Sequence, residues 1–450
     1  MLLVTVYFSR VLPEGSYGAY QYFWVQFYIF SAVACLGIHA VVLTYSPPVL
    51  DRLLRAMPPL LLRALPLWML AVSAVFAVLQ HRAGFSFVTP FAFLLILSCS
   101  AIAESVLVAF RRFGVLVPAN LLYAGFFCGA HWLKVRYGYD MPALFFIIAL
   151  LAALRLLWYV AVIIRFRRQL PGGDADLTVP APADIRSLWI HMGVYDLVQI
   201  LFRWVDKLVI ALVVSAELFA VYYNGTIEIP FLPLILSAAG SAGLLQLAAA
   251  HAADDRAGQS HQLLLRSGRI LSCIVFPLFF FLLFFRYELF GVLLSSKYLP
   301  SVPVFLVSLF AVPVRAYSFT TVLQHYHKGR IINTGAVLDL VLACALMYPL
   351  YRLSGLPGVA LSFVITTYLQ AAFYLYHTAR ILQLPVLRLL PLRNWLWKVA
   401  LSCVLFLAAH NLLAGMLQPP VLLIAGIMLL AACTVMILGA EIRNERKRIL

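Results

Sequence analysis

Apolar stretches separated by short polar connections run through almost the entire chain. A helix needs about 20 apolar residues to cross a hydrocarbon core of ~30 Å, and long continuous runs indicate helices rather than a β-barrel. The pattern predicts thirteen full spans, preceded by an incomplete apolar piece over residues 1–9. The predicted full spans lie at 17–45, 57–80, 84–110, 113–133, 141–164, 185–214, 218–249, 268–290, 301–324, 331–352, 356–382, 395–415 and 419–440.

Composition agrees with this pattern. Of the 450 residues, 64% are hydrophobic and 11% are charged, and the mean hydropathy is +0.98. These values exclude an ordinary soluble domain and favour an all-α polytopic membrane protein. The start, Met1-Leu2-Leu3, has no basic residues and no cleavage site follows, so no cleavable signal peptide is expected.

The net charge of +16 is distributed unevenly between the two ends of the predicted spans. When the short N-terminal piece is numbered as helix 1, the connections after the even-numbered helices and the C-terminal tail carry 22 basic residues. The opposite side carries seven. The positive-inside rule therefore places the even connections and the C-terminus in the cytoplasm. The basic face reads as a topology signal with contact to membrane lipids, and nucleic acid is not an expected partner.

The longest connection divides the chain into two lobes. It contains Pro171-Gly172-Gly173 and three aspartates, which is typical of a flexible linker, and it follows six predicted helices. We expect an N-terminal six-helix lobe over 1–165, a cytoplasmic linker over 166–183 and a C-terminal six-helix lobe over 184–383. Residues 384–450 add helices 13 and 14 and a basic cytoplasmic tail.

An internal repeat supports two related lobes. Ser9–Tyr20 and Ala211–Tyr222 both pass from an apolar helix, through a short acidic turn, to an aromatic helix start. Parallel repeats of this kind relate two bundles about an axis along the membrane normal, with a substrate site near the midplane. The offset between the halves also predicts that the first helix is truncated, since nine apolar residues cannot cross a bilayer.

Ionisable residues inside the predicted spans are the candidates for a polar cavity, because such charges usually face a partner or water. They are Glu104, Arg155, Asp196, Arg203, Asp206, Lys207, Glu228, Arg315 and Asp339. Spacings of three, four and three place four polar residues on one helix face: Asp196, Gln199, Arg203 and Asp206. Two readings stay open here: the stripe lines a cavity, or Arg203 and Asp206 neutralise each other while Lys207 snorkels.

No sequence feature predicts a cofactor, a metal site or catalytic residues. The seven cysteines fall in apolar spans without a CxxC motif, so we interpret them as small packing residues. His325 and His327 alone are insufficient evidence for a metal. No GxxxxGK[ST] motif for a nucleotide occurs, and no connection exceeds about 20 residues, which leaves no room for an extramembrane catalytic domain.

Three segments resemble a known family. Ser9–Tyr20 is similar to the first-helix turn of polysaccharide biosynthesis proteins, and Asp206–Tyr222 looks like their seventh-helix signature. Ser296–Pro303 resembles the stretch that enters their tenth helix. These are the Wzx-type oligosaccharide flippases of the multidrug/oligosaccharidyl-lipid/polysaccharide exporter superfamily. The resemblance covers most of residues 1–383; the family's usual glycine after the helix-7 turn is Ala220 here.

The resemblance implies a transporter of the bacterial inner membrane and not an enzyme. It would flip an undecaprenyl-diphosphate-linked oligosaccharide from the cytoplasmic to the outer leaflet by alternating access, for cell-surface polysaccharide such as O-antigen, capsule or exopolysaccharide. A glycan polymerase is a further candidate partner.

The implied cargo gives the buried charges candidate roles. A lipid diphosphate favours arginine, and neither Arg315 nor Arg155 has an acidic residue nearby in the sequence. Glu228 lies before Pro230, where freed carbonyls would help to form a polar site. Glu104, Glu228 and Asp339 are candidates for ion coupling, although an inter-helix hydrogen bond explains Glu104 and Asp339 equally well. Tyr20, Tyr22, Tyr222 and Tyr223 are candidates for stacking on sugars.

Two other functions remain open. A multidrug or small-cation exporter of the same superfamily would share the fold, and the mixture of four basic and five acidic intramembrane residues does not exclude it. A membrane-embedded glycosyltransferase or polymerase is disfavoured by the short outer connections.

Overall fold

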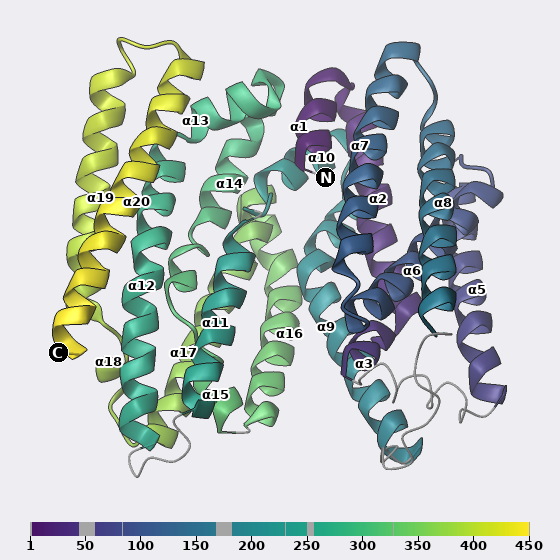
Figure 1. Cartoon of the computed structure of the whole chain (residues 1–450). Coiled ribbons are helices and arrows are strands. Elements are labelled where there is room, and N and C mark those ends of the chain that lie inside the picture. Colours follow the sequence, from purple (N-terminus) through teal and green to yellow (C-terminus); the bar gives the residue numbers. More distant parts are fainter. Residues whose placement is uncertain are drawn as a thin grey trace. The chain divides into compact units, whose positions relative to one another are not determined.

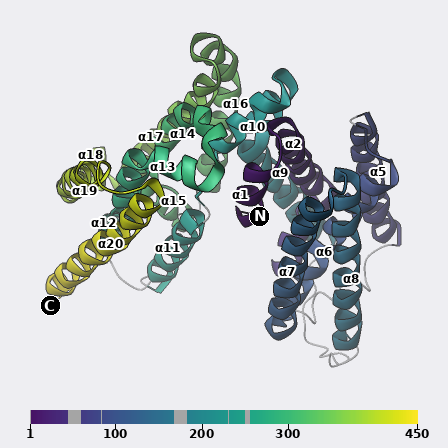
Figure 2. The same ribbon diagram turned by 90° about the horizontal axis from the view of Figure 1, so that it is seen from above.

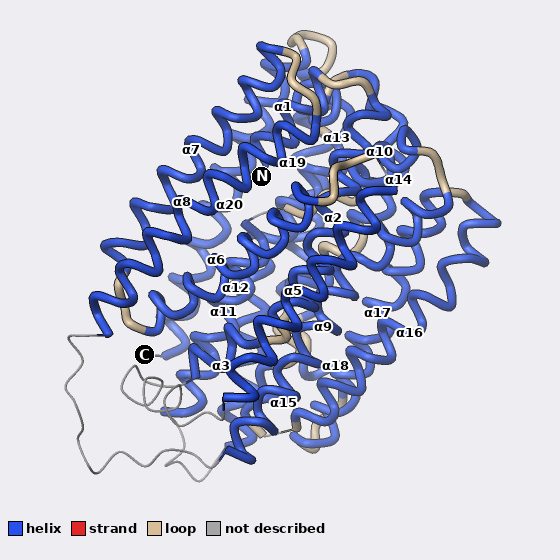
Figure 3. Tube along the Cα trace, turned by 90° about the vertical axis from the view of Figure 1, so that its right-hand side faces the viewer, coloured by secondary structure: helices blue, strands red, loops and turns tan. Residues whose placement is uncertain are grey.

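The computed structural model describes residues 2–44, 59–82, 84–167, 182–229, 231–249, 256–326 and 328–449. Within these ranges the chain is built from helices and has no strand (Figure 3). Contacts divide the chain into two units, Leu3–Ala216 and Glu217–Leu450. Most of the linker predicted over 166–183 lies outside the described residues, as do Pro230 and His327. The two-lobe boundaries drawn from the sequence stay a prediction.

The first unit contains eight helices in its described part (Figure 1). They are α1 (Leu2–Val11), α2 (Glu14–Cys35), α3 (Ile38–Thr44), α5 (Pro59–Arg82), α6 (Val88–Ala109), α7 (Phe113–Tyr137), α8 (Met141–Arg167) and α9 (Pro182–Val213).

The second unit begins in α10 and ends in α20. It contains α10 (Ala216–Gly225), α11 (Phe231–Ala249), α12 (Arg256–Phe284), α13 (Arg286–Leu289), a π-helical turn (Phe290–Leu294), a 3-10 turn (Ser296–Ser301), α14 (Val302–Leu309), a 3-10 turn (Pro313–Ala316), α15 (Thr321–His325), α16 (Gly329–Ser354), α17 (Leu356–Leu382), α18 (Val386–Leu389), α19 (Leu392–Leu413) and α20 (Pro419–Ile449).

The predicted spans correspond to these helices, but several of them are interrupted. Nine helices in the described part of the chain are long and apolar enough to cross a membrane. The spans predicted over 17–45, 218–249, 268–290 and 301–324 are each built from shorter helices joined by a break. The all-α polytopic prediction is therefore confirmed, with four broken spans that an apolar pattern alone does not reveal.

The breaks have local causes. Pro13 has no backbone N–H to donate and disfavours a helical Leu12, so α1 ends at Val11 and α2 begins at Glu14. Leu36 and Gly37 adopt left-handed conformations, with φ of 43° and 69°, and separate α2 from α3. The turn between α9 and α10, at Val214 and Ser215, is also two residues long, so both turns of the predicted repeat are present.

Helix α9 and the start of α10 pack against α2 and its C-terminal turn through glycines. A Cβ atom on Gly18 of α2 would overlap the carbonyl of Ala216, the first residue of α10, and a Cβ atom on Gly193 of α9 would lie 2.8 Å from the carbonyl oxygen of Leu36. The Trp189 indole N–H donates a hydrogen bond of 2.8 Å to that same carbonyl. Because lipid tails are as apolar as the side chains, such close backbone packing is a main source of helix association in a membrane.

Aromatic rings fill the centre of the first unit. Phe23 of α2 stacks on Phe145 of α8 with ring centroids 3.8 Å apart. The Tyr20 hydroxyl donates a 2.8 Å hydrogen bond to His131 Nε2, because His131 Nδ1 donates to the Phe127 carbonyl. This pair satisfies the polar atoms inside an otherwise apolar core.

In the second unit, the C-terminal helices lie against α12. Figures 1 and 2 show α19 and α20 running beside it. Gly426 of α20 permits the approach, because a Cβ atom there would lie 2.6 Å from the ring of Phe285. Helices α16 and α17 form a second close pair, in which Gly358 has no room for a side chain beside the Leu350 carbonyl.

Candidate functional site

Arg155 joins three helices of the first unit. Its Nη1 donates a 2.9 Å hydrogen bond to the Asn120 side-chain oxygen, which also accepts a 2.9 Å hydrogen bond from the Tyr159 hydroxyl. The Asn120 amide nitrogen then donates to Glu104 over 2.7 Å. Asn120 of α7 thus links the cation of α8 to the carboxylate of α6. The arrangement lets two opposite charges share one amide inside the helix bundle.

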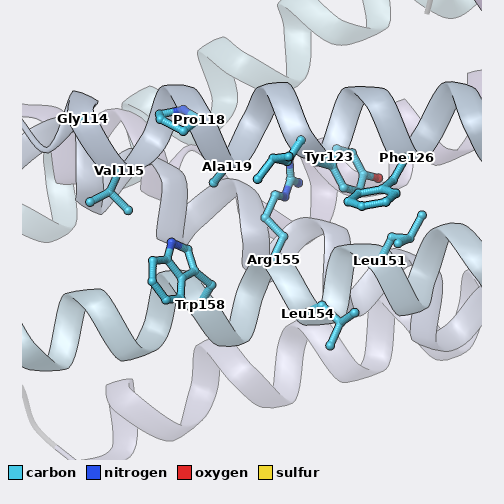
Figure 4. A pocket seen from close by; sticks show the side chains of 11 residues that line it. Gly114, Val115, Pro118, Ala119, Tyr123, Phe126, Leu151, Leu154, Arg155 and Trp158 are labelled. Carbon is cyan, nitrogen blue, oxygen red and sulfur yellow. The ribbon is translucent and has the colours of Figure 1, made fainter.

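A groove between α7 and α8 exposes this network. Its volume is about 460 Å³, and Figure 4 shows Arg155 reaching across it from α8 towards α7. The lining consists of Gly114, Val115, Pro118, Ala119, Leu122, Tyr123, Phe126, Leu151, Leu154, Arg155 and Trp158. Arg155 is the one charged member of that lining, and its guanidinium lies 4.0 Å from the centre of the Tyr123 ring. Such a cation–π contact holds the side chain in place.

The sizes of the side chains along α7 and α8 shape the groove. Gly114, Pro118, Leu122 and Phe126 recur every four residues and therefore form one ridge of α7. The first two are short and the last is large. On α8, Trp158 lies three residues after Arg155, on nearly the same face. Trp158 and Phe126 are each more than half exposed, so the groove opens outward from the unit.

The polar stripe predicted on the seventh span lies on one continuous helix, α9. Asp196 pairs with His39 of α3 over 3.1 Å, and Asp206 pairs with the neighbouring Lys207 over 3.3 Å. Asp206 and Lys207 are buried, whereas Gln199 and Arg203 are exposed. The Trp204 ring stacks on Tyr28 of α2 at 5.0 Å, so this stretch of α9 faces α2. The stripe is thus divided between paired and exposed groups.

Of the candidates in the second unit, Glu228 and Arg315 lie at helix breaks, and Asp339 lies inside α16. Glu228 is exposed in the break between α10 and α11, where the Thr226 hydroxyl caps the Tyr222 carbonyl at 3.0 Å. Arg315 is exposed in the 3-10 turn that follows α14. Asp339 of α16 is 2% exposed, beside Thr366 of α17 and within electrostatic range of Arg315. A role for any of these residues in transport stays a prediction.

Comparisons with known proteins agree with this architecture. Residues 174–303 match the family model described as polysaccharide biosynthesis protein. The predicted family resemblance is confirmed over that segment. It contains the polar stripe of α9 and Glu228. No curated protein sequence gives a match.

The fold is that of a known lipid flippase. The chain is similar to a solved structure of the lipid II flippase MurJ in an inward closed conformation, with a TM-score of 0.65. The alignment covers 98% of this chain and 96% of that one, at 13% sequence identity. At this identity the likeness concerns the fold.

The sequence analysis missed a charged network at the C-terminal helices. Lys398 of α19 and Glu441 of α20 are 0% and 1% exposed and lie 3.0 Å apart. Lys398 Nζ also donates to the Arg269 carbonyl at 2.6 Å, and Arg269 pairs with Glu445 at 2.7 Å. Arg269 and Lys398 are among the 22 basic residues from which the sequence predicts the topology, and their sequence neighbours do not indicate a pairing. The available signal was the pair Glu441 and Glu445, spaced by four residues in an otherwise basic tail.

The partners of Arg155 come from other helices, so the sequence around Arg155 does not show them. The expectation that tyrosines stack on sugars is wrong for Tyr20 and Tyr222, which are 1% and 0% exposed and pack inside the protein. For Tyr22 and Tyr223, which are partly buried, it stays a prediction.

Proposed function

We propose that this protein flips a polyprenyl-diphosphate-linked oligosaccharide from the cytoplasmic to the outer leaflet of a bacterial inner membrane. The observation that carries the proposal is the combination of a flippase fold along nearly the whole chain with a polysaccharide biosynthesis segment over residues 174–303. The transported units would serve cell-surface polysaccharide assembly, by alternating access and without a catalytic step. Membrane lipids and a glycan polymerase are proposed partners.

The distribution of basic residues supports the proposed orientation. Twenty-two of them lie in the even connections and the tail, against seven on the other side. By the positive-inside rule, this asymmetry supports a cytoplasmic C-terminus. The cargo would therefore be loaded at the side where α7 begins and α8 ends.

Arg315 is the proposed ligand of the cargo phosphate. Its side chain is exposed at a helix break, so it can reach a ligand without unfolding a helix. An arginine can contact two phosphate oxygens at once, which suits a diphosphate. Asp339 is the proposed ion-coupling group, because a carboxylate 2% exposed inside a helix pair exchanges a cation or proton only when the packing around it changes.

The test is deletion of the gene in its host, followed by measurement of lipid-linked oligosaccharide and surface polysaccharide. We expect repeat units to accumulate inside and surface glycan to be lost, with rescue by the wild-type gene. An unchanged glycan together with altered drug sensitivity would contradict the proposal and move the protein to the multidrug exporter branch.

Ion coupling needs a separate measurement. Flipping by the purified protein in liposomes should depend on a proton or sodium gradient, and Asp339→Asn should remove that dependence. Flipping that ignores both gradients would refute the coupling role and leave the cargo assignment intact.

A further inference from the structure

The α7–α8 groove is long enough to follow a lipid chain through one leaflet. It extends from Gly114 to Phe126 on α7, and twelve residues of helix span about 18 Å. Half of a ~30 Å hydrocarbon core is about 15 Å. The groove is bordered by the two helices, with Trp158 and Leu154 on the α8 side (Figure 4). Arg155 is the one charged residue of its lining, so most of the groove suits a hydrocarbon chain.

Positive charge gathers at the end of the groove near Gly114. Arg111 and Arg112 directly precede α7, and Arg165 lies seven residues after Trp158, on the same face of α8. The Arg112 guanidinium lies 3.5 Å from the centre of the Phe166 ring, which brings the start of α7 against the end of α8. All three arginines are exposed, and none forms an ion pair with a carboxylate of the described residues.

The charge of Arg155 inside the groove is balanced. Arg155 is linked through Asn120 to the carboxylate of Glu104. It therefore adds a polar group to the groove but does not form a second strong anion site. Any anionic group on the ligand is drawn to the mouth, where the arginines form no ion pair with a carboxylate in the part of the chain that the structure describes.

From the largely apolar lining and the basic mouth we infer that this groove binds a single-chain isoprenoid phosphate lipid. The phosphate lies on Arg111, Arg112 and Arg165, and the chain lies between α7 and α8. This inference rests on the proposed function, because such a lipid is the carrier of the proposed cargo. It adds a site on the outer face of the first unit, separate from Arg315, where the carrier lipid is held in the cytoplasmic leaflet.

The test is equilibrium binding to the full chain in phosphatidylcholine nanodiscs, measured by native mass spectrometry. The probes are a polyprenyl monophosphate, the corresponding polyprenol, a two-chain phosphatidic acid and inorganic phosphate. We expect the polyprenyl monophosphate to bind at least about tenfold more tightly than each of the others, the gain of one charge-assisted contact. Equal binding of phosphatidic acid, or of polyprenol, would overturn the inference.

Matched variants locate the binding. Leu154→Trp fills the groove from an exposed position, and Leu157→Trp makes the same change on the same helix outside the lining. Gly114→Leu narrows the groove at a position where a Cβ atom meets nothing within 4 Å. We expect the first and third to weaken binding of the polyprenyl monophosphate about tenfold, and Leu157→Trp to leave it unchanged. Equal binding by all three variants would overturn the site.

The mouth is tested with Arg111→Gln together with Arg165→Gln, and the control is Arg136→Gln at the opposite end of α7. Only the double variant should lose affinity, by about tenfold or more. Flipping of the complete cargo is measured in parallel. If the wild-type chain binds the polyprenyl monophosphate but does not flip the cargo, the proposed function is refuted and the lipid site in the groove is retained. If the wild-type chain flips the cargo and every groove variant binds the lipid as tightly as the wild type, the lipid site is refuted and the proposed function is retained.

Discussion

Two of the charged networks in the described residues differ in how far they are buried. In the second unit, Lys398 and Glu441 are 0% and 1% exposed and pair directly. In the first unit, Arg155 and Glu104 do not touch but share Asn120, beside a groove that opens outward. A buried charge in a span is therefore not in itself a mark of a transport site. A charge that a ligand can reach is a candidate binding group, whereas a fully buried ion pair serves to hold helices together.

The strongest test of this difference is Glu441→Leu. The change leaves Lys398 buried with hydrogen bonds but without a counter-charge, so we expect a loss of about 3–5 kcal/mol in the free energy of unfolding. Thermal and denaturant unfolding of the purified full chain measures it. Arg443→Gln, an exposed position on the same helix, is the control. A loss below about 1 kcal/mol would mean that the network is weak.

The double variant Lys398→Met with Glu441→Leu sharpens the result. Arg269 keeps Glu445 as a partner at 2.7 Å, so removing both sealed charges leaves no uncompensated ion at their site. We expect most of the stability lost in Glu441→Leu to return, since apolar replacement of a buried pair is often neutral. If the double variant is as unstable as the single one, the loss comes from packing and not from charge.

The open network should respond less. Asn120→Leu removes the amide that links Arg155 to Glu104, and we expect a loss of about 1–3 kcal/mol in unfolding free energy, the cost of leaving hydrogen-bonding groups without that partner. Asn411→Leu, an exposed position in α19, is the matched control and should change little. A loss as large as that of Glu441→Leu would show that access makes no difference to these charges.

Arg315→Ala should have the smallest effect on stability. Its exposed side chain predicts a change within about 0.5 kcal/mol. Flipping of the lipid-linked cargo should fall about tenfold or more, the value of one charge-assisted phosphate contact. Arg330→Ala is the control, since Arg330 is also exposed but lies in the first turn of a helix. Normal flipping by Arg315→Ala would remove this residue from the transport path.

The positions of the helices are easier to predict from the sequence than the side-chain contacts between them. Apolar runs and Pro13 suffice to place the spans and the first break, because both act locally. Pairing between helices is not local, so nothing near Arg155 points to Asn120, and nothing near Lys398 points to Glu441. The remaining signal was an uncommon polar residue inside a span, such as Asn120, or an acid in a basic tail, such as Glu445.

The contact of α9 with α2 has a consequence for dividing the chain. Gly193 and Trp189 hold α9 against the Leu36 carbonyl, and the first contact unit ends at Ala216 rather than at the linker. Two separately expressed fragments that meet at residues 216–217 would each keep their own contacts. Fragments that meet at 183–184 would leave the first one without its longest helix and expose the glycine surface of α2.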